Sequence, residues 1–160
     1  MSTILETRLR PWPTEADCAA SAQALARQRA LGDAFVELHG PLGAGKTTFA
    51  RHLLHGLGVD GAIKSPTYTL MEPYRAGDDA GGFEIAHCDF YRFDDPGEWE
   101  DAGFRDVFAS PGLKLVEWPE KAEALLPPCD LRVSIAPSES SPARSARFDA
   151  LSETGRELLP

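Results

Sequence analysis

The sequence predicts an α/β fold with a central mixed, mainly parallel β-sheet. A short apolar run, 34–39, leads through a glycine-rich turn into a helical pattern over 46–57, which makes a strand–turn–helix unit. A second run, 112–118, is largely apolar, as a strand buried in a parallel sheet should be. Two β-rich runs, 65–76 and 82–93, flank the turn GDDAG and predict a hairpin. With 160 residues, 42% hydrophobic and 26% charged, we expect one globular domain over residues 1–160.

Before the glycine-rich turn, the chain is expected to form one helix and one strand. Thr14 and Asp17 fit the S/T-x-x-D/E capping pattern, and the following stretch is rich in Ala, Leu, Arg and Gln. These features predict a helix from Glu15 to Ala30. The strand 34–39 follows and runs directly into Gly40.

After the hairpin, short elements alternate. The pattern predicts two short helices over 94–110 with a break at Gly103, the strand 112–118, a brief helix over 121–126 that a proline stops, and strands over 130–136 and 145–152. A Ser/Pro-rich loop joins the last two strands.

The glycine-rich turn carries the strongest chemical signal. Residues 40–47, GPLGAGKT, match the pattern G-x-x-x-x-G-K-S/T. Its glycines allow backbone N–H groups to curl round a phosphate, at the positive end of the following helix. Lys46 would then reach the β- and γ-phosphates, and the Thr47 hydroxyl would bind Mg²⁺. The strand before and the helix after are the required context, so we predict a nucleotide-binding P-loop and a P-loop NTPase-like three-layer fold. Kinases, GTPases, motors and switches share this feature.

A P-loop needs an acidic partner at the end of a neighbouring strand to hold Mg²⁺, directly or through water. Asp89 ends the run FEIAHCD, and Glu117 ends GLKLVE. The strand before Glu117 is the more apolar of the two, but a solvated carboxylate at a strand end is the ordinary alternative for either residue. Both acids therefore remain candidates.

Other groups of polar residues are weaker signals. His52 and His55 are three apart on a helix but have no third metal ligand nearby, which favours surface histidines. His87 and Asp89 would share one strand face and Cys88 the other, which makes a poor metal site. The stretch 89–106 carries a local charge of about −5, either a solvated face or a docking surface for a basic partner.

The net charge of −9 should repel nucleic acid from this chain, so any contact with tRNA would belong to another subunit. The first residues contain no apolar core of signal-peptide length, and no apolar run could span a bilayer, so we expect a cytoplasmic protein without a membrane contact. The three cysteines are widely spaced, which predicts reduced thiols in or near the core.

Four segments together resemble the bacterial TsaE family: GPLGAGKTTFAR, KSPTYTL, HCDFYRF and LVEWPE. Members of this family are small P-loop ATPases of the pathway that makes N6-threonylcarbamoyladenosine (t6A) at position 37 of tRNAs reading codons that begin with A. The resemblance covers about residues 12 to 130. It implies ATP and its product ADP as nucleotides, and Mg²⁺ as the metal ion.

The resemblance also implies roles for individual residues. The phosphates would be held by Gly43, Ala44, Gly45, Lys46, Thr47 and Thr48. Thr47 and Glu117 would bind Mg²⁺, and Asp89 would be a functional acid near the nucleotide.

The remaining carried-over roles lie at the edges of the nucleotide site. Thr67 would be a switch-like residue near the γ-phosphate, and Trp118 would lie close to the same site. The segment around Glu15 corresponds to one that approaches the base, and Arg144 would approach the nucleotide from the late loop.

Members of this family act with two proteins, TsaD and TsaB. A separate synthase makes the threonylcarbamoyl-adenylate, TsaD transfers the carbamoyl group to tRNA, and ATP hydrolysis associated with TsaE supports multiple turnovers. The alternative is a free-standing small-molecule kinase, whose arginine-bearing lid could come only from Arg144 and Arg147. A GTPase is disfavoured because no N-K-x-D motif occurs.

Overall fold

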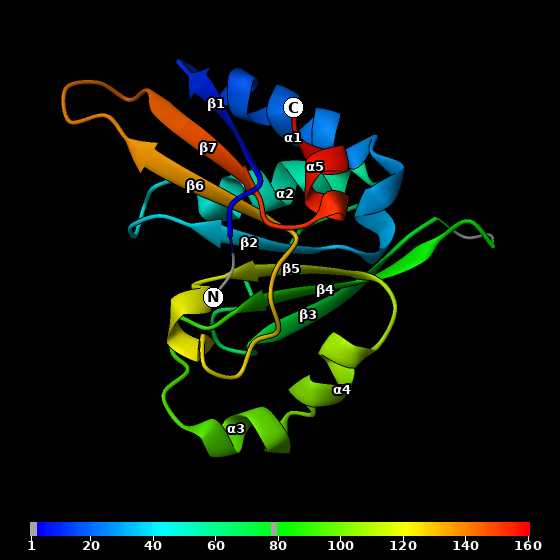
Figure 1. Cartoon of the computed structure of the whole chain (residues 1–160). Coiled ribbons are helices and arrows are strands. Elements are labelled where there is room, and N and C mark those ends of the chain that lie inside the picture. The colour runs from blue at the N-terminus through cyan, green and yellow to red at the C-terminus, as the bar shows by residue number, and fades with distance from the viewer. Residues whose placement is uncertain (1–2, 78–79) are drawn as a thin grey trace.

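The computed structural model describes residues 3–77 and 80–160 (Figure 1). Its helices and strands, with η marking 3₁₀ helices, are β1 (Glu6–Trp12), α1 (Glu15–Ala26), η1 (Arg29–Asp33), β2 (Phe35–His39), α2 (Lys46–Gly56), β3 (Met71–Ala76), β4 (Phe83–Asp89), α3 (Pro96–Asp101), α4 (Phe104–Ala109), β5 (Leu113–Glu117), η2 (Pro119–Ala122), β6 (Leu131–Pro137), β7 (Arg144–Ala150) and α5 (Glu153–Leu158).

Within the described residues, the strands form one seven-stranded sheet in the order β1-β7-β6-β2-β5-β4-β3. In the middle, β2 pairs in parallel with β5 and β6, and β5 pairs in parallel with β4. At the edges, the pairs β1–β7, β6–β7 and β3–β4 are antiparallel. The predicted mixed sheet with a parallel centre is confirmed.

Helices cover both faces of the sheet, which makes three layers (Figure 1). Helices α1, α2 and α5 lie on one face, and α3 and α4 lie on the other. Leu115 packs in the apolar cluster under α2, whereas its neighbour Val116 packs in the cluster of Trp99 and Phe104 from α3 and α4. Successive side chains of a strand point to opposite faces, so β5 must be apolar on both. This is why its sequence is a continuous apolar run.

The first helix is shorter than the sequence predicts. The expected cap is present, because the Thr14 N–H donates to the Asp17 carboxylate at 2.9 Å. The helix ends at Ala26 instead of Ala30, since Gln28 takes an extended conformation. The 3₁₀ helix that follows turns the fully buried Leu31 into the core, so packing overrides local helix propensity here.

Two other expected elements are also wrong in part. The strand expected from residue 65 begins only at Met71; residues before it form a turn closed by Leu70 N–H donating to the Pro66 carbonyl at 2.7 Å. The helix expected over 121–126 is replaced by the 3₁₀ turn Pro119–Ala122 and a loop. Too few residues lie between the prolines to offset the cost of nucleating an α-helix.

Two elements were not predicted at all, β1 and α5. In β1 only Trp12 is buried, Leu9 is 68% exposed, and Pro11 interrupts the strand pattern, so periodicity gives no signal. The strand exists because it pairs with β7 over its whole length and because the Trp12 ring stacks on Phe49 at 5.5 Å.

Two other expectations hold. The pair of short helices is divided at Gly103, which has a φ of 73°. The three cysteines are free and buried. In the described part of the chain, no helix is long and apolar enough to cross a membrane.

Candidate functional site

The carboxyl ends of β2, β5 and β4 meet the first turn of α2. A cavity of about 410 Å³ lies there, lined by residues 42–48, by Thr67, by Asp89 with Tyr91 and Arg92, and by Glu117 with Trp118. In open α/β sheets, ligands bind outside the carboxyl ends of the strands, because loops and helix N-termini converge at that edge. The topology thus brings the P-loop and both candidate acids into one place.

Glycine is needed at different positions of the turn for different structural reasons. Gly40 has a φ of 146°, and a Cβ there would lie 2.5 Å from the Ile135 carbonyl oxygen of β6, so the close approach excludes a side chain. Gly43 and Gly45 also have positive φ, but a Cβ on either would meet no atom within 4 Å. At these two positions glycine is needed for conformation alone, and the turn is open on its cavity side.

Lys46 is nearly buried, at 5% exposure. Its ammonium donates to the carbonyl oxygens of Gly40 and Pro41, and it lies 3.6 Å from the centre of the Trp118 ring. Burial lowers the pKa of Lys46, and the negative charge of Glu117 works in the opposite direction. The lysine charge is therefore held at the turn by backbone carbonyls and an aromatic face.

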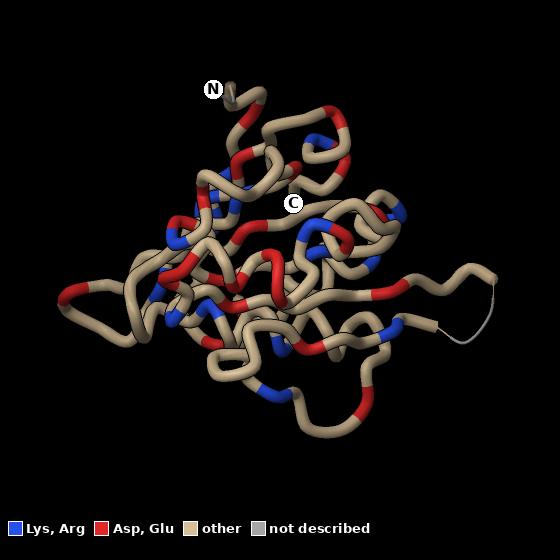
Figure 2. The backbone as a smooth tube through the Cα atoms, turned by 90° about the horizontal axis from the view of Figure 1, so that it is seen from below, with Lys and Arg blue, Asp and Glu red and all other residues tan. Residues whose placement is uncertain are grey.

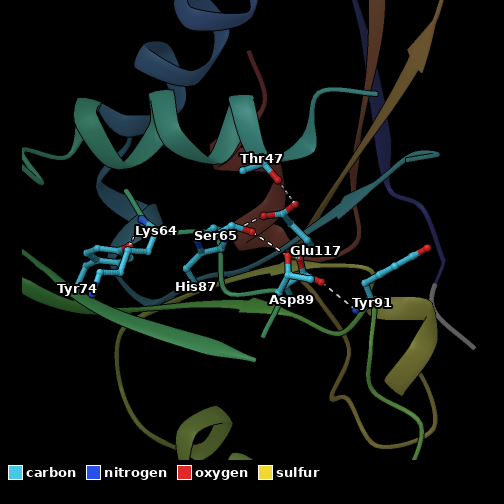
Figure 3. A network of polar contacts seen from close by, with 9 residues as sticks. Thr47, Lys64, Ser65, Tyr74, His87, Asp89, Tyr91 and Glu117 are labelled. Atoms are coloured by element: carbon cyan, nitrogen blue, oxygen red, sulfur yellow. Dashed lines mark hydrogen bonds and ion pairs between the residues drawn. The ribbon is translucent and has the colours of Figure 1, made fainter. Parts of the chain in front are cut away.

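Glu117, at the end of β5, is held through both carboxylate oxygens (Figure 3). The Thr47 hydroxyl donates to Oε1 at 2.7 Å, and the His87 Nε2–H donates to Oε2 at 2.7 Å. Both His87 and Glu117 are almost completely buried, with 0% and 1% of the side chain exposed. The two donors fix the position of this carboxylate below the first turn of α2.

Sequence reasoning missed the role of His87. The alternation of β4 placed it on the face of Asp89, and the structure agrees, since Cys88 packs in the cluster on the opposite face. The sequence does not indicate the register between β4 and β5. This register sets Asp89 beside Glu117 and lets His87 reach Glu117 diagonally.

Asp89 is the second acid of the cavity. Its Oδ1 accepts the Tyr91 N–H at 2.8 Å (Figure 3). Its Oδ2 accepts the Thr67 hydroxyl at 3.0 Å. Burial raises the pKa of Asp89; the Tyr91 N–H opposes this effect, and the nearby Glu117 adds to it. Both acids that the sequence left as alternatives therefore line the same cavity.

The structure brings one of the two outlying candidates to the P-loop. Arg144 donates through Nε to the Ala44 carbonyl at 2.8 Å and through a terminal nitrogen to the Gly43 carbonyl at 3.3 Å. Glu15 does not line the cavity, because it lies in the first turn of α1 with its carboxylate 3.2 Å from His52 on α2. A role of Glu15 in base binding stays a prediction.

The two histidines of α2, His52 and His55, each contact one polar group. His55 on α2 contacts the Gly61 carbonyl at 3.2 Å, and no group of three or more His, Cys, Asp or Glu able to hold a metal occurs among the described residues. Asp and Glu are distributed throughout the fold (Figure 2). This is in keeping with the net charge of −9.

Comparisons with known proteins agree on one family. The family model described as "Threonylcarbamoyl adenosine biosynthesis protein TsaE" matches residues 12–146. The tRNA threonylcarbamoyladenosine biosynthesis protein TsaE of Haemophilus influenzae is 42% identical over 124 residues, covering 78% of this chain and 75% of the relative. The protein of the same name from Bacillus subtilis is 40% identical over 98 residues, covering 61% of this chain and 58% of the relative. The crystal structure of Bacillus subtilis YdiB aligns with a TM-score of 0.76 and 26% identity over 98% of this chain and 94% of that one.

Proposed function

Since the chain belongs to the TsaE family of threonylcarbamoyl adenosine biosynthesis proteins, we propose that it binds and hydrolyses ATP. It would do so as a subunit of the machinery that forms the threonylcarbamoyl group on adenosine 37 of tRNA. One observation carries the proposal. A glycine-rich turn, a buried lysine and a carboxylate bonded to the P-loop threonine converge in a single cavity. This is the arrangement that phosphate binding with a metal ion requires.

The turn fits the phosphate chain of a nucleotide. Because Gly43 and Gly45 leave open space where a side chain would be, a phosphate can approach the backbone N–H groups of residues 43–48. The ammonium of Lys46 lies over the same turn and supplies positive charge to the β- and γ-phosphates. Arg144, bonded to the carbonyls of Gly43 and Ala44, stabilises the shape of the turn from outside.

Thr47 and Glu117 fit a Mg²⁺ site, because a hydroxyl and a carboxylate are the hard oxygen ligands that this ion prefers. Mg²⁺ bound there would neutralise part of the phosphate charge. Asp89 stands beside Glu117 and would orient water, and the Thr67 hydroxyl bonded to it lies at the cavity wall. We assign the chemistry to Lys46, Thr67, Asp89 and Glu117.

The remaining components of the reaction would come from partners. The chain is acidic and should not bind tRNA by itself, so we propose that it acts in the cytoplasm with TsaD and TsaB, which would meet the tRNA. Its own ATPase activity should be low and should rise strongly when both partners are present.

ATP hydrolysis measured with and without TsaD and TsaB tests this proposal. Lys46→Ala should largely abolish turnover with both partners present, while circular dichroism shows an unchanged fold. Lys64→Ala, which removes an exposed lysine outside the cavity, is the matched control and should keep the wild-type rate. Wild-type turnover in Lys46→Ala would contradict the P-loop assignment. Full activity of the wild type without partners would favour a free-standing ATPase or kinase.

A further inference from the structure

Arg92 lines the cavity and is exposed to solvent. It follows Asp89 by three residues in a segment with seven acids: Asp89, Asp94, Asp95, Glu98, Glu100, Asp101 and Asp106. No carboxylate lies within ion-pair distance of Arg92 among the described residues, although Arg105 of the same segment lies 3.9 Å from Glu100. Arg92 is near these acids in sequence but forms an ion pair with none of those described. Its positive charge is therefore available for an anion in the cavity.

The guanidinium of Arg92 rests on a weak contact. Its central carbon lies 4.6 Å from the centre of the Tyr68 ring, and a terminal nitrogen lies 3.4 Å from the Tyr68 hydroxyl. Tyr68 is 81% exposed, so water competes with both interactions. Cation–π contacts are weak at exposed sites, and 3.4 Å is long for a hydrogen bond. Arg92 can therefore leave this ring at low cost.

The two positively charged residues of the cavity differ in burial and in their contacts. Among the described lining residues, the cations are Lys46 and Arg92, and the carboxylates are Asp89 and Glu117. Lys46 is buried at the P-loop and bonded to backbone carbonyls. Arg92 is exposed, follows the end of β4 by three residues, and lines the same cavity as Asp89 and Thr67. A second, exposed cation is thus available in the same cavity.

We propose that Arg92 leaves Tyr68 when a nucleoside triphosphate binds and pairs with its terminal phosphate, so that the chain distinguishes ATP from ADP. This inference rests on the proposed function, since it concerns the same nucleotide site. A terminal phosphate adds charge and oxygen atoms that a diphosphate lacks, and the planar guanidinium can bind two such oxygens at once. Arg92 thereby contributes to triphosphate binding and little to diphosphate binding.

Calorimetric titration with Mg²⁺ and either ADP or a non-hydrolysable ATP analogue tests the inference. Arg92→Ala should weaken analogue binding by about tenfold or more, as loss of a charge-assisted contact predicts, while ADP affinity stays within about twofold. Arg92→Lys should lie between the wild type and Arg92→Ala, because it keeps the charge without the two-point geometry. Arg105→Ala removes the same charge from the same acidic segment outside the cavity and should change neither affinity.

Tyr68→Ala tests the release step. The ring holds Arg92 only in the nucleotide-free protein, so analogue binding should be as tight as in the wild type or tighter. Weakening as large as that in Arg92→Ala would show that the stacked position is the binding position and would overturn release.

Further outcomes would also overturn the inference. Equal losses for ADP and analogue, or no loss for either, would show that Arg92 does not read the terminal phosphate. Unchanged nucleotide binding with weaker association to TsaD and TsaB would assign Arg92 to a docking surface. A wild type that binds neither nucleotide would refute the proposed function as well, whereas a wild type that binds both would leave that function standing.

Discussion

Replacing His87 by alanine should destabilise the protein by about 3 kcal/mol, because its partner Glu117 would remain buried without one of its two donors. The Nε2–Oε2 distance is 2.7 Å, and neither side chain has more than 1% of its surface exposed. Loss of the His87 donor therefore leaves Oε2 of Glu117 in a buried position at the end of β5. The loss should therefore appear in the free energy of unfolding as well as in activity.

The magnitude has two parts. A hydrogen bond to a charged group contributes about 1.5–3 kcal/mol, and a buried acceptor left without a donor costs about 1–3 kcal/mol. Part of these two costs is the same loss counted twice. The adjacent 410 Å³ cavity can also supply a water molecule to Oε2 of Glu117, so the expected destabilisation lies in the lower half of the combined range. By comparison, removal of one partner of a buried ion pair costs about 3–5 kcal/mol, and this range sets the upper bound for the destabilisation by His87→Ala.

Urea unfolding followed by far-UV circular dichroism measures the effect. His52→Ala is the matched control: His52 lies 3.2 Å from Glu15 on the exposed surface, and such pairs contribute at most about 1 kcal/mol. The double variant His87→Ala/Glu117→Ala should be less destabilised than the sum of its single variants by about 1.5 kcal/mol or more. The reasoning is refuted if His87→Ala is no worse than His52→Ala, or if the single effects are additive.

Three further predictions concern the cavity and the acidic segment. Glu117→Ala should remove most of the Mg²⁺-dependent part of ATP-analogue affinity, about tenfold, while metal-free binding changes less; unchanged affinity in calorimetry would move the metal role to Asp89. Burial raises the folded pKa of Asp89, so folding is favoured at this site in acid, and this contribution is lost as the pH rises from the unfolded value through the raised folded value. Asp89→Asn should therefore raise the melting temperature at pH values above the folded pKa, flatten its fall as the pH rises from the unfolded through the folded pKa, and reduce turnover at least about tenfold; an unchanged pH profile would contradict the burial effect. Charge reversal at Glu98, Glu100 and Asp101 should weaken association with TsaD and TsaB more at low salt than at high salt, since exposed charges are screened beyond about 10 Å at 0.1 M ionic strength; binding that ignores both the variant and the salt would return these residues to a solvated face.

The outlying site candidates show the limit of sequence reasoning. Arg144 reaches the P-loop, one hundred residues earlier in the chain, because β7 pairs with β6 and β6 pairs with β2, the strand that leads into the P-loop. Glu15 is instead directed toward His52 by the packing of α1 on α2. No local pattern distinguishes these two outcomes. The roles of both residues in nucleotide binding, like the single domain over 1–160, stay predictions.

The sequence by itself determined the features that depend on neighbouring residues. The P-loop between β2 and α2, the buried strand before Glu117 and the helix pair around Gly103 follow from glycine conformation, apolar periodicity and turn chemistry, which act within a few residues.

Tertiary structure alone decided what depends on the pairing of distant strands. Pairing with β7 makes β1 an edge strand, and α1 ends early because Leu31 is buried in the core. The register between β4 and β5 is also a result of tertiary packing. That register places Asp89 beside Glu117 and gives Glu117 its second donor, His87. A one-residue slip would move every one of these side chains to the opposite face, and only the packing of both sheet faces against their helices excludes it.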